Sequence, residues 1–190
     1  MDNIYDRLMK PLESKWLNEY RKLIMPYAHG NVLEVGFGTG VNLKHYDFSS
    51  IQSFTALDLD SKKEFTPKTN YPITYVNGEV ENLPFEDNSF DTIVETLVLC
   101  SVKDMNKAIS EIFRVLKPGG TFIFIDHVLP EKPLMANAFK GVNFIWNHFT
   151  GGCNLTRQPH LILDKYNLNF IEKGSFADNI FRYGVVSKKE

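Results

Sequence analysis

Residues 32–40 carry the sequence VLEVGFGTG, and this stretch decides the fold class of the 190-residue chain. Its first four residues are mostly apolar, which predicts a buried strand. Gly36, Gly38 and Gly40 predict a sharp turn whose backbone can approach a ligand at van der Waals distance. Because a helix is predicted to open at Val41–Leu43, the glycines lie on a strand–turn–helix connection. Such a connection is typical of a nucleotide-type binding site in an α/β domain.

The spacing of the glycines argues against two common nucleotide ligands. The dinucleotide fingerprint G-x-G-x-x-G needs its third glycine one residue later, where Val41 stands. The Lys-Ser/Thr pair of a phosphate-binding P-loop is also missing after Gly40. Glu34, two residues before the first glycine, would repel a pyrophosphate and suits a cationic ligand. The stretch therefore disfavours a nicotinamide oxidoreductase and a nucleoside triphosphatase.

The rest of the chain alternates short apolar runs with helical windows, which predicts a mostly parallel sheet covered on both faces. Asn3–Pro26 is predicted to be helical and to divide at Pro11, and an amphipathic helix is predicted from Met105 to Leu116. The last two strands are expected to pair antiparallel across residues 174–182. The predicted strands, seven in all, are 32–35, 53–57, 73–76, 92–94, 121–125, 169–173 and 183–187.

We expect one domain, residues 1–190, with three parts. Residues 1–30 form a helical lid, in which Tyr5 and Met9 cover the ligand; residues 31–129 form the ligand-binding core; residues 130–190 form an acceptor-side segment and the terminal hairpin. The aromatic stretch Phe139–Phe149 allows two interpretations, an acceptor pocket or the core-facing side of one helix. A further helical window covers 155–166.

Composition limits the partners and the compartment. The formal net charge of −2 disfavours nucleic acid as a partner. The N-terminus lacks the apolar region of a secretory signal, and no apolar run reaches the roughly 20 residues of a membrane span. Two cysteines suit a reducing compartment. We therefore expect a cytoplasmic protein without a transmembrane anchor.

Two further carboxylates follow predicted strands. Asp58 ends the second strand, where a carboxylate can accept hydrogen bonds from both hydroxyls of a ribose. Glu79 follows the third strand and could accept from an adenine amino group, while the backbone amide of Val80 meets a ring nitrogen. The parallel sheet brings these positions to one edge with the glycine loop.

Together these segments resemble the class I S-adenosylmethionine-dependent methyltransferases. The resemblance is carried by residues 34–40, Asp58, residues 78–85, residues 90–94 and RVLKPGG at 114–120. It implies a three-layer Rossmann-like fold, a seven-stranded sheet with an antiparallel last strand, and S-adenosyl-L-methionine as cofactor. It also implies a set of cofactor-binding residues: Glu34, Gly36, Phe37, Gly38, Gly40, Asp58, Leu59, Glu79, Val80, Thr96 and Leu97.

A second resemblance concerns the acceptor. TLVLCSV at 96–102, Asp126-His127-Val128 and GCNLTR at 152–157 are similar to the methyltransferase-like alkyl thiol S-methyltransferases. That family usually has Glu-His-Val at the second segment, and its animal members begin with an apolar anchor helix that this chain lacks. The resemblance implies a small-molecule acceptor, an alkyl thiol first. The alternatives are methylation of a phospholipid or other amine, and a non-catalytic protein that binds S-adenosylmethionine. An Asn/Asp-Pro-Pro-Tyr/Phe motif for base methylation is missing after the fourth strand, where residues 95–98 read ETLV.

His127 is the candidate general base, because it follows the fifth predicted strand at the ligand-binding edge. A histidine held by local hydrogen bonds is the competing interpretation, and Asp126 could orient the ring or simply end the strand. Cys100 is expected to be buried packing, and Cys153 is not a convincing nucleophile. The five histidines and two cysteines do not show metal-ligand spacing, so no metal site is predicted.

Overall fold

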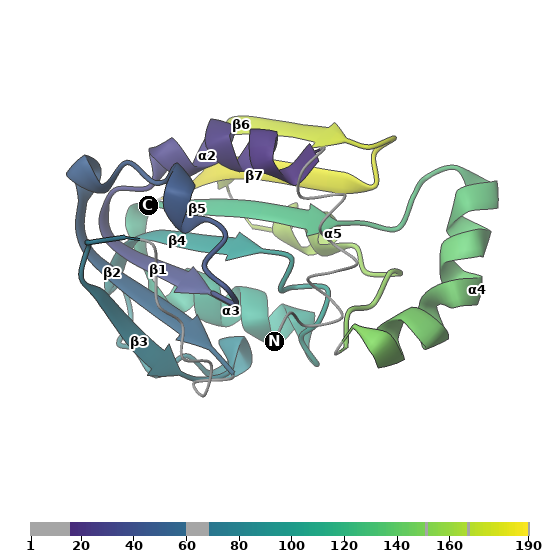
Figure 1. Cartoon of the computed structure of the whole chain (residues 1–190), viewed down its shortest axis with the longest axis horizontal. Coiled ribbons are helices and arrows are strands. Elements are labelled where there is room, and N and C mark those ends of the chain that lie inside the picture. The colour runs from purple at the N-terminus through teal and green to yellow at the C-terminus, as the bar shows by residue number, and fades with distance from the viewer. Residues whose placement is uncertain (1–15, 60–68, 151, 167, 190) are drawn as a thin grey trace.

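The computed structural model describes residues 16–59, 69–150, 152–166 and 168–189 (Figure 1). The first predicted helix and the lid residues Tyr5 and Met9 lie outside this part of the chain. Within the described residues, no helix combines the length and the apolar character needed to cross a membrane.

The centre of the structure is a seven-stranded sheet in the order β3-β2-β1-β4-β5-β7-β6. The first five strands run parallel, and β7 is antiparallel to both of its neighbours. The predicted seven-stranded sheet, including its terminal hairpin, is confirmed. The strands are β1 (Gly30–Val35), β2 (Ile51–Asp58), β3 (Ile73–Asn77), β4 (Phe90–Thr96), β5 (Leu116–His127), β6 (Leu168–Phe176) and β7 (Phe181–Lys188).

Helices cover both faces of the sheet (Figure 1). The α-helices are α2 (Asn18–Ile24), α3 (Met105–Val115), α4 (Pro133–Phe149) and α5 (Pro159–Leu163). Short 3-10 turns are η2 (Met25–Tyr27), η3 (Leu43–His45), η4 (Phe48–Ser50) and η5 (Val80–Asn82). In Figure 1, α2 lies over the β6–β7 hairpin, α3 lies behind the strands, and α4 stands away from the sheet.

Alternation along the strands builds one hydrophobic core on each face. In β1, Leu33 and Val35 belong to the core beneath α3, whereas Val32 belongs to the core beneath α2. In β5, Phe122 faces α3 and Ile123 faces α2. This is the period of two that a strand buried on both faces requires. The central strands are therefore fixed from both sides, and their carboxyl ends are held at a common edge.

The amphipathic helix α3 matches its prediction closely. It begins after Asp104, whose side chain accepts a hydrogen bond from the Lys107 N–H at 3.1 Å, as a helix-capping residue does. Ala108, Ile109 and Ile112 are fully buried on its inner face. The helix ends at Val115, and β5 begins with the next residue.

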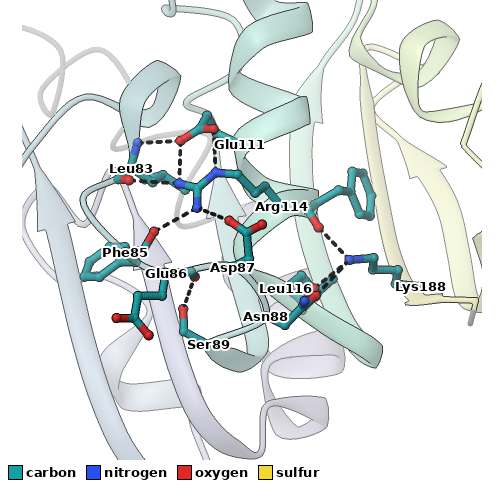
Figure 2. A network of polar contacts seen from close by, with 11 residues as sticks. Leu83, Phe85, Glu86, Asp87, Asn88, Ser89, Glu111, Arg114, Leu116 and Lys188 are labelled. Atoms are coloured by element: carbon teal, nitrogen blue, oxygen red, sulfur yellow. Dashed lines mark hydrogen bonds and ion pairs between the residues drawn. The ribbon is translucent and has the colours of Figure 1, made fainter.

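A network of polar contacts links α3 to the segment after β3 (Figure 2). The Arg114 guanidinium donates to both carboxylate oxygens of Glu111 at 2.8 Å, to the Leu83 carbonyl at 3.0 Å and to the Phe85 carbonyl at 2.8 Å. Glu111 also accepts from the Leu83 N–H at 2.9 Å. Arg114 of the RVLKPGG motif therefore fixes the loop that follows η5.

Two local predictions are wrong. The residues after the glycine loop form only the 3-10 turn η3, which is followed by Tyr46 in an extended conformation; the side chains of Asn42 and Tyr46 turn inward and hydrogen-bond Glu34. Residues 155–166 contain only the short helix α5, which starts at Pro159, a residue suited to the first helical position.

The helix that carries the aromatic stretch does not pack into the core. No residue of α4 is buried; Phe144 is 86% exposed and Val142 is 50% exposed. The interpretation of this helix as a core element is therefore wrong.

Candidate functional site

The glycine loop and the end of β2 are joined directly. Gly38, whose φ is +56°, donates its backbone N–H to the Oδ2 atom of Asp58 at 2.7 Å. The N–H groups of Gly36 and Phe37 donate to the Leu57 carbonyl at 2.8 and 3.1 Å. The glycine loop and Asp58 are thus hydrogen-bonded to each other at the edge of the sheet where the parallel strands end.

Gly36 has a steric requirement that explains its residue type. Its φ is +66°, and a Cβ atom placed there would lie 2.1 Å from Cγ2 of Val98. No side chain other than hydrogen fits at that distance. The absence of a side chain lets the segment after β4 pack against the glycine loop.

Glu34 lies under the glycine loop with 1% of its surface exposed. Its carboxylate accepts hydrogen bonds from the Tyr46 hydroxyl at 2.6 Å and from the Asn42 amide at 2.9 Å. Burial raises the pKa of Glu34 to about 7, although these two hydrogen bonds act in the opposite direction. The same Asn42 amide donates to the Thr96 hydroxyl at 3.1 Å. Glu34 and Thr96 thus hold the chain that follows the glycine loop in place through their hydrogen bonds to Asn42.

A cavity of about 340 Å³ opens between the ends of β1, β2, β3 and β4. Six of the predicted cofactor-binding residues line it: Gly36, Asp58, Leu59, Glu79, Val80 and Leu97. The other predicted residues are Glu34, Phe37, Gly38, Gly40 and Thr96. None of these five is in the cavity wall, and Phe37 is a core side chain that packs edge-on against the rings of Phe54 and Tyr75.

Several features of this cavity fit an adenosine-containing cationic ligand. Leu59 is 68% exposed although it is apolar, so it offers an apolar surface to a flat ring. Asp58, Glu79 and Glu81 give the wall an acidic character, with Lys103 as the basic member at 3.4 Å from Glu79. The apolar side chains and carboxylates therefore suit S-adenosylmethionine better than a phosphate-rich nucleotide.

The segment after β4 has an unusual backbone where it borders the cavity. Leu97 has a φ of +60°, a conformation that L-residues rarely adopt. The buried carboxylate of Glu95 accepts hydrogen bonds from the N–H groups of Val98 and Leu99, which holds this turn in place. Burial raises the pKa of Glu95 to about 7.

Next to this turn, three side chains from distant parts of the chain meet. The ligand atoms of Cys100, His127 and Cys153 all lie within 4.8 Å of one another, and all three residues are buried. The His127 Nε2 atom lies 3.0 Å from the Sγ atom of Cys153, which also accepts from the Trp146 indole N–H at 3.4 Å. We refer to Cys100, His127 and Cys153 as the Cys–His cluster.

The two thiols of the cluster differ in acidity. The neighbouring Cys100 thiol, with contacts from His127 and Trp146, lowers the pKa of Cys153 to about 4, although burial acts to raise it. The contact with Cys153, reinforced by burial, raises the pKa of Cys100 well above its usual value. Burial and the neighbouring Glu95 carboxylate raise the pKa of Asp126. Asp126 is therefore a buried group at the end of β5.

The three segments that carry the thiol-methyltransferase resemblance come together here. The Asn154 N–H donates to the Cys100 carbonyl at 2.9 Å, and Arg157 donates to the Val102 carbonyl at 2.9 Å. His127 joins them through its contact with Cys153. Sequence reasoning missed this cluster because its members are separated by 27 and 26 residues. The only available signal was that each lies in one of the three resembling segments.

Comparisons with known proteins agree with this geometry. The family model described as a methyltransferase domain matches residues 33–124. Human thiol S-methyltransferase TMT1A is 31% identical, and the match covers 85% of this chain and 69% of that protein. The mitochondrial methyltransferase OMS1 of Saccharomyces cerevisiae is 32% identical, and the match covers 90% of this chain but only 41% of OMS1.

A solved structure shares the fold. The methyltransferase in complex with the Trm112 activator of Haloferax volcanii superposes with a TM-score of 0.71 at 19% identity, covering 98% of this chain and 96% of that one. An identity this low shows a common fold alone. From the sequence relatives and the fold together, the chain belongs to the class I S-adenosylmethionine-dependent methyltransferases, a family whose members include the thiol S-methyltransferases, and it is an S-adenosylmethionine-dependent methyltransferase.

Proposed function

We propose that this methyltransferase acts on a small-molecule alkyl thiol. The observation that carries the proposal is the meeting of residues 97–102, His127 and residues 152–157 beside the cavity. Apart from Leu97, their residues are not among those that the cofactor resemblance implies, so their assembly in one place points to an acceptor site. The similarity to thiol S-methyltransferase TMT1A supports the same class of acceptor.

We propose that the cavity at the glycine loop holds the cofactor. When bound, S-adenosylmethionine supplies a methyl group that is attached to a sulfonium sulfur. On transfer of the methyl group, the rest of the cofactor is left as a neutral thioether. Asp58 accepts from the ribose hydroxyls, Leu59 packs on the adenine ring, and Glu79 and Val80 bind its polar edge. The glycine loop and Leu97 border the methionine end. Contacts of Glu34, Gly38 and Thr96 keep this loop in shape, together with the hydrogen bond from the Gly40 N–H to the Phe37 carbonyl at 3.0 Å.

We propose that His127 promotes the deprotonation of the acceptor thiol. A thiol attacks as thiolate, so a group that removes its proton raises the reactive fraction at neutral pH. The turn on either side of Cys100 forms part of the cavity wall through Leu97 and Ser101, and the Cys–His cluster lies behind it. The proximity of the cluster to this turn supports a role for His127 at the acceptor end of the site. The reaction also requires that the acceptor sulfur lie in line with the methyl carbon and the sulfonium sulfur of the cofactor.

Two finer expectations accompany this function. A reducing compartment such as the cytoplasm suits two free cysteines, and cell fractionation with an antibody checks it. Nucleic acid remains disfavoured as an acceptor by the net charge of −2.

A turnover screen tests the proposal. Purified protein is incubated with methyl-labelled S-adenosylmethionine and, separately, with alkyl thiols, amines and phospholipids, and labelled product is counted. The proposal expects thiols to be methylated fastest. Rapid methylation of an amine or phospholipid, with none of any alkyl thiol, would overturn it.

A further inference from the structure

The Cys–His cluster has the donor set of a soft-metal site. Two sulfur atoms and one imidazole nitrogen converge within 4.8 Å from the turn after β4, the end of β5 and the segment after α4. Thiolate and imidazole are the ligands that Zn²⁺ prefers in proteins, and two cysteines with one histidine are a known three-ligand combination. His127 is held on β5, and the hydrogen bond from the Asn154 N–H to the Cys100 carbonyl at 2.9 Å ties the segments of the two cysteines together.

Burial separates this cluster from an accidental surface group of side chains. Cys100 is fully buried, Cys153 is 2% exposed and His127 is 6% exposed. The three donor atoms are therefore enclosed by the protein rather than gathered by chance at its surface.

The spacing of the donors needs only a small adjustment to hold an ion. Tetrahedral Zn²⁺ with bonds of about 2.0–2.3 Å places its ligand atoms roughly 3.3–3.8 Å apart. The His127 Nε2 and Cys153 Sγ atoms are 3.0 Å apart, and the largest separation in the cluster stays below 4.8 Å. Changes of up to about 1 Å in these separations, within the reach of side-chain rotation, bring the three atoms to that spacing.

We propose that Cys100, His127 and Cys153 bind one Zn²⁺ ion through their two sulfur atoms and the His127 Nε2 atom, leaving a fourth position open. Sites with three protein ligands and an open position are characteristic of catalytic rather than structural zinc.

The position of this site suggests what an ion would do. The Cys100 Sγ atom contacts the Leu97 carbonyl at 3.4 Å and the Ser101 hydroxyl at 3.5 Å, and both residues line the cavity. An acceptor thiol that reaches the open position would bind as thiolate, and its proton would pass to solvent. His127 would then promote the deprotonation of the acceptor thiol indirectly, as a ligand of the ion. This catalytic role rests on the proposed function, whereas binding of the ion does not.

Cobalt substitution tests the site without any turnover. Reduced, metal-free protein is titrated with Co²⁺, and thiolate-to-cobalt charge-transfer absorption is recorded in the near ultraviolet. Because the chain contains only two cysteines, such a band in the wild-type protein comes from Cys100 or Cys153. We expect the band to saturate at one Co²⁺ per chain and to disappear when Zn²⁺ is added. Absence of the band from folded, reduced protein would overturn the proposal.

Variants then locate the ion. Zn²⁺ affinity is measured by competition with a chromophoric chelator. It should fall by more than about 100-fold in the double variant Cys100→Ser/Cys153→Ser and in His127→Gln. This loss is larger than the loss of affinity caused by changing residues that only contact the ligands. His29→Gln, at an exposed histidine of the opposite sheet edge, should bind like the wild type. Circular dichroism verifies folding. Equal Zn²⁺ affinity in the wild type and in a folded double variant would contradict the assignment.

Discussion

The backbone N–H of Gly38 donates to the Asp58 carboxylate at 2.7 Å, so the carboxylate proposed to hold the ribose also holds the glycine loop. A change at Asp58 therefore acts on the ligand directly and through the loop. This double function makes Asp58 the most informative position for the cofactor site.

Asp58→Ala should weaken the binding of S-adenosylhomocysteine by about 1.5–3 kcal/mol, because charge-assisted hydrogen bonds to the ribose are lost. Isothermal titration calorimetry measures the change. Asp58→Asn, which can still accept from Gly38, should bind with intermediate affinity. Unchanged affinity in a folded Asp58→Ala protein would remove this residue from the site.

Gly36→Ala should lower both the melting temperature and the affinity for S-adenosylhomocysteine. The added Cβ would meet the Val98 side chain at 2.1 Å and would sit at a φ of +66°. In a Val98→Ala background the loss should be smaller, because the clashing methyl group is gone. Thermal denaturation of the four proteins of this cycle gives the coupling between the two positions. A purely additive result would show that the two residues do not contact each other in solution.

The elevated pKa of Glu34 predicts a specific pH dependence of stability. The carboxyl has a pKa of about 7 in the folded protein and 4.5 in a free chain. The folded state therefore holds its proton more tightly, and as pH rises from about 4.5 to 7 the unfolded state ionises first. The free energy of unfolding should fall through this window, by up to about 3 kcal/mol, and stay level above it.

Glu34→Gln isolates this contribution, because glutamine does not titrate and Asn42 has an unpaired buried Oδ1 atom that can accept from the new amide. Urea denaturation at pH 5 and pH 8 compares the variant with the wild type. The variant should gain stability relative to the wild type as the pH rises. A stability difference that is the same at both pH values would show that Glu34 ionises normally.

His127→Ala should lower turnover by roughly 10²–10⁴-fold, the usual contribution of a group that handles a proton. S-adenosylhomocysteine affinity should change little, because His127 does not line the cavity of about 340 Å³. Steady-state kinetics and calorimetry give the two values, with His29→Ala as the matched control. A loss below threefold would argue against any part for His127 in the reaction.

Much of the fold could be predicted from the sequence, because period-two alternation and the punctuation by glycine and proline are local signals. Leu33 and Val35 point to one core and Val32 to the other, as a strand buried on both faces demands. The end of α3 and the terminal hairpin followed from equally local patterns. Asp58 could be placed at the glycine loop because parallel strands end at one edge.

The errors arose where tertiary contacts override local preference. Side chains of Asn42 and Tyr46 bind the buried Glu34, so the segment after the glycines does not continue as a helix. The aromatic helix α4 has the composition of a core element, yet none of its residues is buried and Phe144 is 86% exposed. The Cys–His cluster has no sequence spacing to reveal it, because only the folded sheet brings Cys100 and Cys153 to His127.

The identity of the methylated atom tests the central claim most directly. Protein is incubated with S-adenosylmethionine that carries a trideuterated methyl group, in the presence of an alkyl thiol and an equimolar primary amine, and the products are identified by mass spectrometry. We predict a trideuteromethyl thioether as the main product, formed at a rate that rises with pH as more thiolate is present. A product methylated on nitrogen, with no thioether from any alkyl thiol, would contradict this account.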